Sequence, residues 1–168
     1  MKRLIALGRS FCYAGRGILS CIKNERNMRI HLCASFYVLL LMPFYGFSRV
    51  EKAAVFLCIG LVTALEAVNT AVEAATDLIS TKKHPLAALA KDAAAGAVLF
   101  AAISAAAVGI TLYYDTAVLR SIFEWFVSRP VLGVLFVLSP AAWAAFIFLP
   151  CKDNGDKDKY NDDNEEVR

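Results

Sequence analysis

The sequence of 168 residues has little charge for its length, and that charge is unevenly spread. Asp, Glu, Lys and Arg make up 20% of the chain, hydrophobic residues make up 58%, and the mean hydropathy is +0.53. These values exclude an ordinary soluble domain. Four blocks with few charges, at 30–47, 53–80, 93–114 and 130–149, are near or above the ~20 residues needed to cross hydrocarbon. The sequence therefore predicts an all-α membrane protein with four transmembrane helices.

Several familiar sequence signatures are also missing. No G-x-x-x-x-G-K-[ST] or G-x-G-x-x-G stretch occurs, which excludes a P-loop or Rossmann nucleotide site. The five cysteines form no C-x-x-C pair, so neither a disulfide framework nor a zinc site is indicated. The N-terminal region lacks the unbroken apolar core of a cleavable signal peptide. The connections between spans are short, so any chemistry must take place on the helices at the membrane face.

The two ends of the chain carry much of its charge. Residues 1–29 interleave basic and apolar side chains, which predicts an amphipathic helix on the membrane surface, with a solvated basic arm as the alternative. Residues 150–168 are acidic and almost free of apolar side chains, which predicts a disordered tail. Fourteen Lys and Arg fall in the N-terminal segment, the 80–92 connection and the tail, against four elsewhere. The positive-inside rule puts these three segments, and hence the N-terminus, in the cytoplasm.

The remaining segments complete a four-part organisation. Residues 30–114 would form a three-span core, whose third span is rich in small residues that let helices approach closely. Residues 115–149 would form an external loop with interfacial aromatic side chains, followed by an additional fourth transmembrane helix. That helix begins after Pro130 and contains Pro140, a residue that can kink a helix. The sequence offers no functional account of this fourth span.

The second predicted span contains polar residues where lipid disfavours them. At about 100° per residue, the side chains on one narrow helix face are Glu66, Asn69, Glu73 and Asp77. An acid at the centre of a spanning helix costs ~2.5–3.5 kcal/mol on insertion scales, so this stripe must face protein, a cation or a ligand. The alternatives to a catalytic site are interhelical hydrogen bonding, a proton or cation path, and a scaffold whose acids pair with a partner's basic residues.

Carboxylates and lysines converge at the cytoplasmic end of this stripe. Glu25 precedes the first span, and the inside connection contributes Lys82, Lys83, His84, Lys91 and Asp92. Carboxylate oxygens hold Mg²⁺, and ammonium groups offset the phosphate charge of a nucleotide. The pattern favours phosphoryl transfer from a nucleotide, because a simple transport path has no evident use for the lysines.

Three stretches carry a resemblance to a known family: NERNMRIH at 24–31, LEAVNTAVEAATDLIS at 65–80 and KHPLAALAKDAAAGAVL at 83–99. In this order they resemble the small integral-membrane prokaryotic diacylglycerol kinases, which include the undecaprenol kinases, over roughly residues 9–114. The resemblance implies a homotrimer in the bacterial cytoplasmic membrane. It also implies transfer of the γ-phosphate of MgATP to the hydroxyl of a membrane lipid, with no nucleic-acid partner.

The resemblance implies a role for each matching residue. Glu66 would be the general base that takes the proton from the lipid alcohol, and it would therefore contact the lipid. Glu25 and Glu73 would be ligands of Mg²⁺ and would contact ATP. Asn69 and Asp77 would support the polar site. The further ATP contacts would come from Tyr13, Lys82, Lys83, His84, Lys91 and Asp92.

Two features qualify this match. Some members carry an arginine where this chain has Ala6, so that contact would be missing or would pass to Arg3 or Arg9. The sequence ERNMRIH resembles the undecaprenol kinase branch more than the diacylglycerol-specific branch. Both acceptors are primary alcohols on apolar tails, so the reacting geometry does not separate them, and diacylglycerol and undecaprenol both stay as candidates.

Overall fold

Helices make up the chain wherever its regular structure is described. The computed structural model describes the backbone of residues 2–79 and 84–149, with side chains from residue 5 onward. In this part of the chain no strand occurs, which confirms the all-α prediction. The elements are α1 (Lys2–Asn24), α2 (Arg26–Leu41), the 3₁₀ helix η1 (Met42–Tyr45), α3 (Arg49–Ile79), α4 (Pro85–Tyr113), α5 (Thr116–Val127) and α6 (Pro130–Phe148).

Four of these segments are long and apolar enough to cross a membrane, as the sequence predicts: Arg26–Tyr45, Arg49–Ile79, Pro85–Tyr113 and Pro130–Phe148. α3 and α4 begin before their apolar blocks. α3 begins four residues before position 53, and α4 begins eight residues before position 93. At ~1.5 Å per residue they measure about 46 Å and 43 Å, well beyond the ~30 Å hydrocarbon thickness. Hydropathy marks only the part of a helix that lies in lipid, whereas backbone hydrogen bonding continues past it into water.

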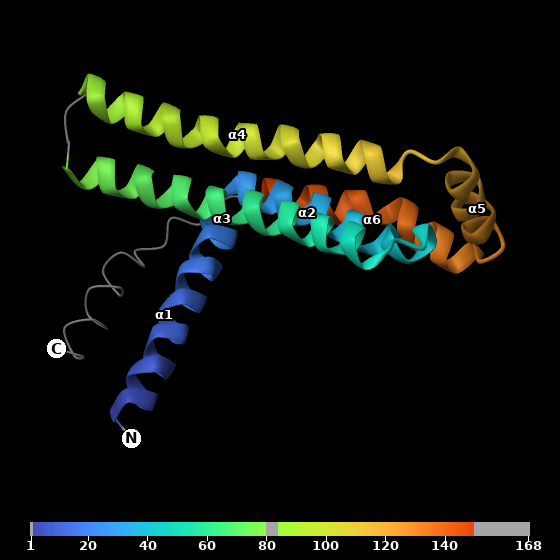
Figure 1. Ribbon diagram of the computed structural model, residues 1–168, viewed down its shortest axis with the longest axis horizontal. Coiled ribbons are helices and arrows are strands. Elements are labelled where there is room, and N and C mark those ends of the chain that lie inside the picture. Colours follow the sequence, from blue (N-terminus) through green and yellow to red (C-terminus); the bar gives the residue numbers. More distant parts are fainter. Residues whose placement is uncertain (1, 80–83, 150–168) are drawn as a thin grey trace.

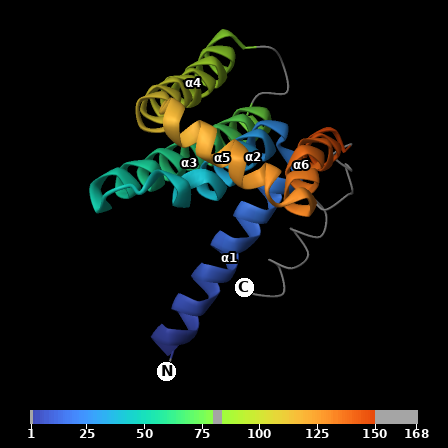
Figure 2. The same cartoon turned by 90° about the vertical axis from the view of Figure 1, so that its right-hand side faces the viewer.

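The spanning helices form an open row in the order α4, α3, α2, α6. α3 packs against α4 on one side and α2 on the other, and α2 also contacts α6. Figure 1 shows α3 and α4 as an antiparallel pair that extends beyond the start of α2, while α1 leaves the bundle at an angle. Figure 2 shows the row from one end, with α5 crossing from α4 to α6. Most large apolar side chains on these helices are exposed, as expected of faces that contact lipid.

Local sequence explains where several helices begin and end. Glu25 has an extended backbone (φ −104°, ψ 117°), which separates α1 from α2 and creates an elbow between them. Gly46 ends η1 in the left-handed conformation (φ 59°), which glycine adopts without steric cost. The side chain of His84 caps α4 by accepting from the backbone N–H of Leu86, and Asp115 caps α5 in the same manner.

Residues Thr116–Val127 form the helix α5 where the sequence predicts an external loop. α5 carries Trp125, which packs edge to face against Phe44 of η1 and against Phe126. Phe126 stacks on Phe136 of α6, with ring centroids 4.5 Å apart. The aromatic side chains that were predicted as interfacial anchors therefore also join α5 to its neighbours. α6 continues as one helix through Pro140.

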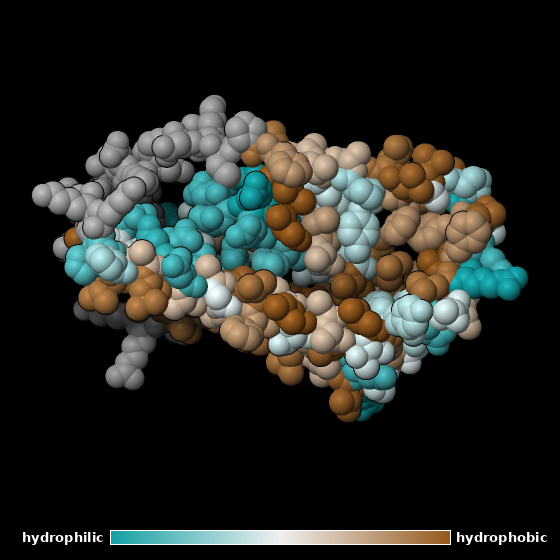
Figure 3. All heavy atoms as spheres, turned by 90° about the horizontal axis from the view of Figure 1, so that it is seen from above, coloured by the Kyte–Doolittle hydropathy of each residue, from teal (hydrophilic) through white to brown (hydrophobic). Residues whose placement is uncertain are grey.

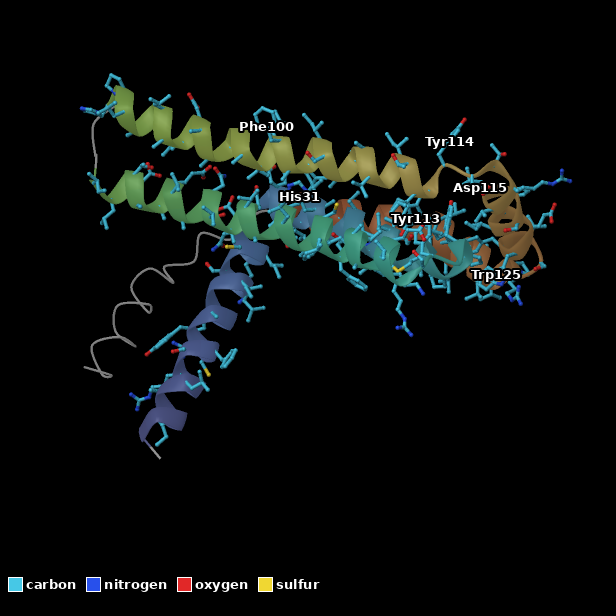
Figure 4. All side chains as sticks on the ribbon, viewed as in Figure 1. His31, Phe100, Tyr113, Tyr114, Asp115 and Trp125 are labelled. Carbon is cyan, nitrogen blue, oxygen red and sulfur yellow. The ribbon has the colours of Figure 1, made fainter. Side chains whose placement is uncertain are left out.

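An apolar core closes the end of the bundle that lies opposite the elbow. Met42, Phe47 and Val55 are buried there, with Tyr45 and Tyr113 packed against them. The Tyr45 hydroxyl donates to the Tyr113 carbonyl (2.9 Å), and the Tyr113 hydroxyl donates to the carbonyl of Val38 (2.9 Å). Figure 4 shows Tyr113 near the point where α4 leads into α5. These contacts hold the end of α4 to α2 and η1.

Removing one of these hydroxyls tests the contribution of this core. Tyr45→Phe is expected to lower the free energy of unfolding by about 0.5–1.5 kcal/mol, because one hydrogen bond is lost while the ring packing is kept. Tyr114→Phe is the matched control, because Tyr114 is 77% exposed. Denaturant unfolding of the purified protein in detergent measures both. Equal stability of the two variants would contradict the described packing.

Candidate active site

Glu66 is the most deeply buried side chain of the polar stripe. It lies in the second half of α3 and is 1% exposed. The side chain of Asn27, in the first turn of α2, makes a hydrogen bond to this carboxylate. A buried carboxylate is tolerated when a donor satisfies it. Asn27 therefore holds Glu66 toward the elbow between α1 and α2.

Asn69 and Glu73 continue the stripe one and two turns beyond Glu66. Asn69 is 6% exposed, and its Nδ2 donates to Oε1 of the half-buried Glu73 (2.9 Å). The Oδ1 atom of Asn69 is buried and accepts no hydrogen bond from the described residues. Buried polar atoms are nearly always satisfied, so such an acceptor marks a position where a donor from outside the chain fits.

Glu25 brings a third carboxylate to this cluster from the elbow. Partial burial raises the pKa of Glu25 above its ordinary value, and repulsion by the Glu73 carboxylate raises it further. Glu25 and Glu73 both act electrostatically on Glu66 as well. Three acids from two segments of the chain are thus close enough to repel one another. A cation placed among them would relieve that repulsion.

The cluster suits a magnesium ion that shares its coordination with phosphate. Among residues 2–79 and 84–149, no group of three or more His, Cys, Asp and Glu side chains is arranged so that it could hold a metal ion by itself. Mg²⁺ rarely depends on such a group, because it is bound in most nucleotide sites by one or two carboxylates, water and phosphate oxygens. The repulsion between Glu25 and Glu73 is the observation that fits a cation at this pair.

A basic side chain of α4 lies beside the end of α3 that projects beyond the elbow. Lys91 Nζ lies 2.5 Å from Asp77 Oδ1, and the pair joins α4 to α3. The two side chains are 36% and 70% exposed, so water screens the pair. Lys91 and Asp92 were predicted in the connection between spans, but both lie about two turns inside α4 because the helix begins at Pro85. Asp92 is exposed.

The other predicted nucleotide contacts are not gathered at the carboxylates. His84 uses its Nδ1 to cap α4. Tyr13 is exposed on α1, which diverges from the bundle, so this single chain does not bring it to the cluster (Figure 1). Lys82 and Lys83 lie outside the described residues, as does the tail at 150–168. Ala6 and Arg9 lie on the exposed part of α1 as well.

The surface near the site is polar on an otherwise apolar molecule. Figure 3 shows hydrophilic side chains gathered in the half of the bundle where α3 ends and α4 begins, while hydrophobic side chains predominate over its middle. The polar stripe thus runs from a buried acid in the apolar region to an exposed ion pair in the polar one. One helix face connects a lipid-facing environment with water.

Sequence reasoning missed two residues that shape this site. Asn27 and Arg29 follow Glu25 by two and four residues, and both contact groups outside α2. Their only sequence signal was position, because each lies within one helix turn of a candidate ligand. Arg29 had been counted only as one of the basic residues at the N-terminal end.

Residues 12–113, more than half of the chain, match the family described as prokaryotic diacylglycerol kinase. The chain belongs to the prokaryotic diacylglycerol kinase family. It is 43% identical over 105 residues to the undecaprenol kinase of Bacillus subtilis, covering 62% of this chain and 85% of that protein. It is 41% identical over 101 residues to a diacylglycerol kinase of Synechocystis, covering 60% and 58%, and 36% identical over 90 residues to that of Haemophilus influenzae, covering 53% and 75%.

Family membership decides between the two functions predicted from the sequence. The match contains Glu25 and the whole stripe from Glu66 to Asp77. A non-enzymatic proton- or cation-conducting protein, the main alternative from the sequence, is not supported. α5 and α6 lie beyond the matched region, which ends at the last residue of α4.

Neutralising Glu25 tests the electrostatics of the cluster. Because the folded-state pKa of Glu25 is raised, its contribution to stability is greatest at low pH and is lost as the pH rises through that pKa. Glu25→Gln is therefore expected to raise the melting temperature at neutral pH in the absence of divalent cations. It should also flatten the decline in stability that begins as the pH rises above the ordinary pKa of a glutamate.

Thermal unfolding in detergent across this pH range measures the effect. Glu124→Gln is the control, because Glu124 is an exposed acid on α5, away from the cluster. A lower melting temperature of Glu25→Gln at neutral pH would show that Glu25 has a stabilising cationic partner, contrary to the repulsion described here.

Proposed function

We propose that this lipid kinase transfers the γ-phosphate of MgATP to the hydroxyl of a membrane lipid, with Glu66 as the general base. Family membership makes the chain a membrane-embedded phosphotransferase with an alcohol acceptor. The observation that carries the residue assignment is the cluster of Glu66, Glu25 and Glu73, in which one acid is buried and the others approach water.

Glu66 would act on a hydroxyl that stays in the membrane. Its partner Asn27 lies in the first turn of α2, next to the elbow at which α1 leaves the bundle (Figure 1), and an amphipathic α1 would follow the membrane surface there. A carboxylate within hydrogen-bond reach of a hydroxyl can act as its general base. The Glu66 carboxylate takes the proton of the lipid hydroxyl while the hydroxyl oxygen of the lipid forms a bond to the γ-phosphorus. The bond from the γ-phosphorus to the bridging oxygen breaks, and ADP leaves with that electron pair.

Glu25 and Glu73 are the residues that would hold Mg²⁺. Bound there, the ion would supply positive charge that offsets the charge developing during transfer. Asn69 supports this arrangement, because its Nδ2 fixes the Glu73 carboxylate while its Oδ1 offers an acceptor to a ligand. Asn27 keeps the Glu66 carboxylate oriented by donating to it.

Lys91 is the described cation best placed to meet the nucleotide phosphates. It lies in the second turn of α4, and the start of α4 projects beyond the elbow (Figure 1), where ATP would arrive from the cytosol. Asp77 holds the Lys91 ammonium group in an exposed pair that a phosphate can replace at little cost. Asp92, His84 and Tyr13 are proposed as further contacts, as are Lys82 and Lys83.

The orientation and the assembly belong to the same proposal. The basic segments would face the cytoplasm, and the elbow and the end of α6 lie on the side toward which the α3–α4 pair projects (Figure 1). A homotrimer would cover outward faces of the open row and could bring α1 of one subunit to the cluster of another. The acceptor is undecaprenol or diacylglycerol, and the higher identity to an undecaprenol kinase favours the former.

Replacing the proposed base tests this function. Glu66→Gln keeps the shape of the side chain but cannot accept the proton, so turnover is expected to fall by about 10²–10⁴-fold with nucleotide binding retained. The assay measures label transfer from γ-labelled ATP to undecaprenol or diacylglycerol in lipid bilayers containing the purified protein and Mg²⁺. Glu124→Gln serves as a folded control.

The two possible failures are distinct. Transfer to neither lipid by the wild-type protein would contradict the proposed substrates, whereas unchanged turnover of Glu66→Gln would place the base elsewhere.

Replacing Lys91, the proposed phosphate-binding lysine, tests its contribution to ATP binding separately from its contribution to the stability of the fold. Lys91→Gln is expected to raise KM for ATP by about tenfold, the effect of losing one charged hydrogen bond. Because the Lys91–Asp77 pair is exposed, stability should change by less than about 1 kcal/mol. Lys52→Gln, an exposed lysine at the opposite end of α3, is the matched control. An unchanged KM for ATP would remove Lys91 from the nucleotide site.

A further inference from the structure

A buried arginine joins the elbow to the helix that lies beyond the family match. Arg29 is 5% exposed. Its Nε donates to the carbonyl of Ile22 (2.8 Å), and its Nη2 donates to that of Lys23, both in the last turn of α1. Its Nη1 donates to the carbonyls of Phe146 and Leu149 at the end of α6 (both 3.0 Å). One guanidinium therefore connects the C-terminal ends of two helices.

The energetics favour this arrangement. The last carbonyls of a helix have no partner within it, and each helix C-terminus carries about half a negative charge. Two such ends directed at Arg29 offset roughly one positive charge. The flat guanidinium presents several fixed donors, whereas a lysine would offer a point charge with less reach. The Phe146 ring adds a cation–π contact, with its centroid 5.3 Å from the Arg29 Cζ.

The same segment of α1 leads directly to Glu25. The backbone N–H of Glu25 donates to the carbonyl of Cys21 (2.8 Å), next to the two α1 carbonyls that Arg29 holds. Consecutive carbonyls of the last turn of α1 are thus bound by groups at the start of α2. The path of the chain at Glu25 depends on these bonds, and Asn27 lies between Glu25 and Arg29.

α6 is fixed to α2 along its length, so it can serve as a rigid support. Tyr37 and Ser139 share a hydrogen bond of 2.6 Å between their hydroxyls. The Trp143 ring packs against Phe36, with centroids 5.6 Å apart. These contacts set the register that places the last carbonyls of α6 at Arg29.

We propose that α6 holds the elbow between α1 and α2 through Arg29, and thereby sets the position of Glu25 beside Glu73 and of Asn27 beside Glu66. Arg29 is in this account a positioning residue that contacts neither substrate. The helix that the sequence left without a role becomes the outer support of the metal-binding acids. The catalytic part of this proposal rests on the proposed function, whereas the structural part does not.

The catalytic arm compares full-length Arg29→Gln and Arg29→Lys with Arg120→Gln, which removes an exposed arginine on α5. Arg29→Gln is expected to raise the Mg²⁺ concentration for half-maximal transfer by about tenfold, equivalent to one charged hydrogen bond, with KM for the lipid changed less than about twofold. Arg29→Lys should lie between Arg29→Gln and the wild type. A general loss of folded protein would instead lower the rate without moving either constant.

A second change tests whether α6 itself is involved. Phe146→Leu removes the aromatic ring over the guanidinium but keeps an apolar side chain and the backbone carbonyl. A smaller shift in the same direction is expected. In the double variant with Arg29→Gln the two shifts should not add, because both changes act on one contact. Additive shifts, or no effect of Phe146→Leu, would separate α6 from the elbow and overturn its role.

A third readout requires no enzymatic activity. Cys21 is buried at the end of α1, so its reaction with a maleimide reports opening of the elbow. The assay uses protein that keeps Cys21 after replacement of Cys12, Cys33, Cys58 and Cys151. Labelling of Cys21 is expected to be about tenfold faster with Arg29→Gln than with Arg120→Gln, equivalent to the loss of one charged hydrogen bond.

The transfer assay and the Cys21 labelling distinguish a failure of the proposed function from a failure of the proposed role of Arg29. If the wild-type protein transfers no phosphate, the proposed function fails, and Cys21 labelling still decides whether Arg29 holds the elbow. If transfer occurs but Arg29→Gln changes neither the Mg²⁺ dependence nor Cys21 labelling, the proposed role of Arg29 is overturned. If Arg29→Gln does not fold, Arg29→Lys and Phe146→Leu provide the same comparison.

Discussion

The burial of the Glu66 carboxylate is the constraint on which the rest of this structure depends. An acid near the centre of a spanning helix costs a few kcal/mol, and an isolated one would be driven to protonate or to leave the apolar region. Asn27 offsets part of that cost by hydrogen bonding to Glu66 from the first turn of α2. Asn27 follows the extended residue Glu25, so the elbow between α1 and α2 lies next to the buried carboxylate.

The same constraint explains the gradient along α3. Glu66 is buried, Glu73 is half-buried and Asp77 is exposed, although all lie on one face of the helix. A lipid hydroxyl stays in the membrane and a nucleotide arrives from water, so a kinase for such an acceptor needs acids at both depths. The three acids carry the same carboxyl group and differ from one another mainly in how far they are buried. The length of α3 and α4 beyond the hydrocarbon core provides the polar end of this gradient.

The sequence predicted the parts of this architecture that follow from periodicity and hydropathy. The four spans follow from hydropathy, and the shared face of Glu66, Asn69 and Glu73 follows from helix geometry. The helix in residues 115–129 and the extension of α4 to Pro85 do not, because capping by Asp115 and His84 determines them and apolar content does not. The roles of Asn27 and Arg29 depend on contacts between distant segments, which spacing along one helix does not show.

Binding of Mn²⁺ in place of Mg²⁺ tests whether Glu25 and Glu73 hold the metal ion while Glu66 serves as the base. The measurement is an electron paramagnetic resonance titration of the protein in bilayers with a non-hydrolysable ATP analogue. We expect saturable Mn²⁺ binding that is weakened in both Glu25→Gln and Glu73→Gln and is retained in Glu66→Gln. Binding that is lost only with Glu66→Gln, or that is the same in all three variants, would contradict this assignment.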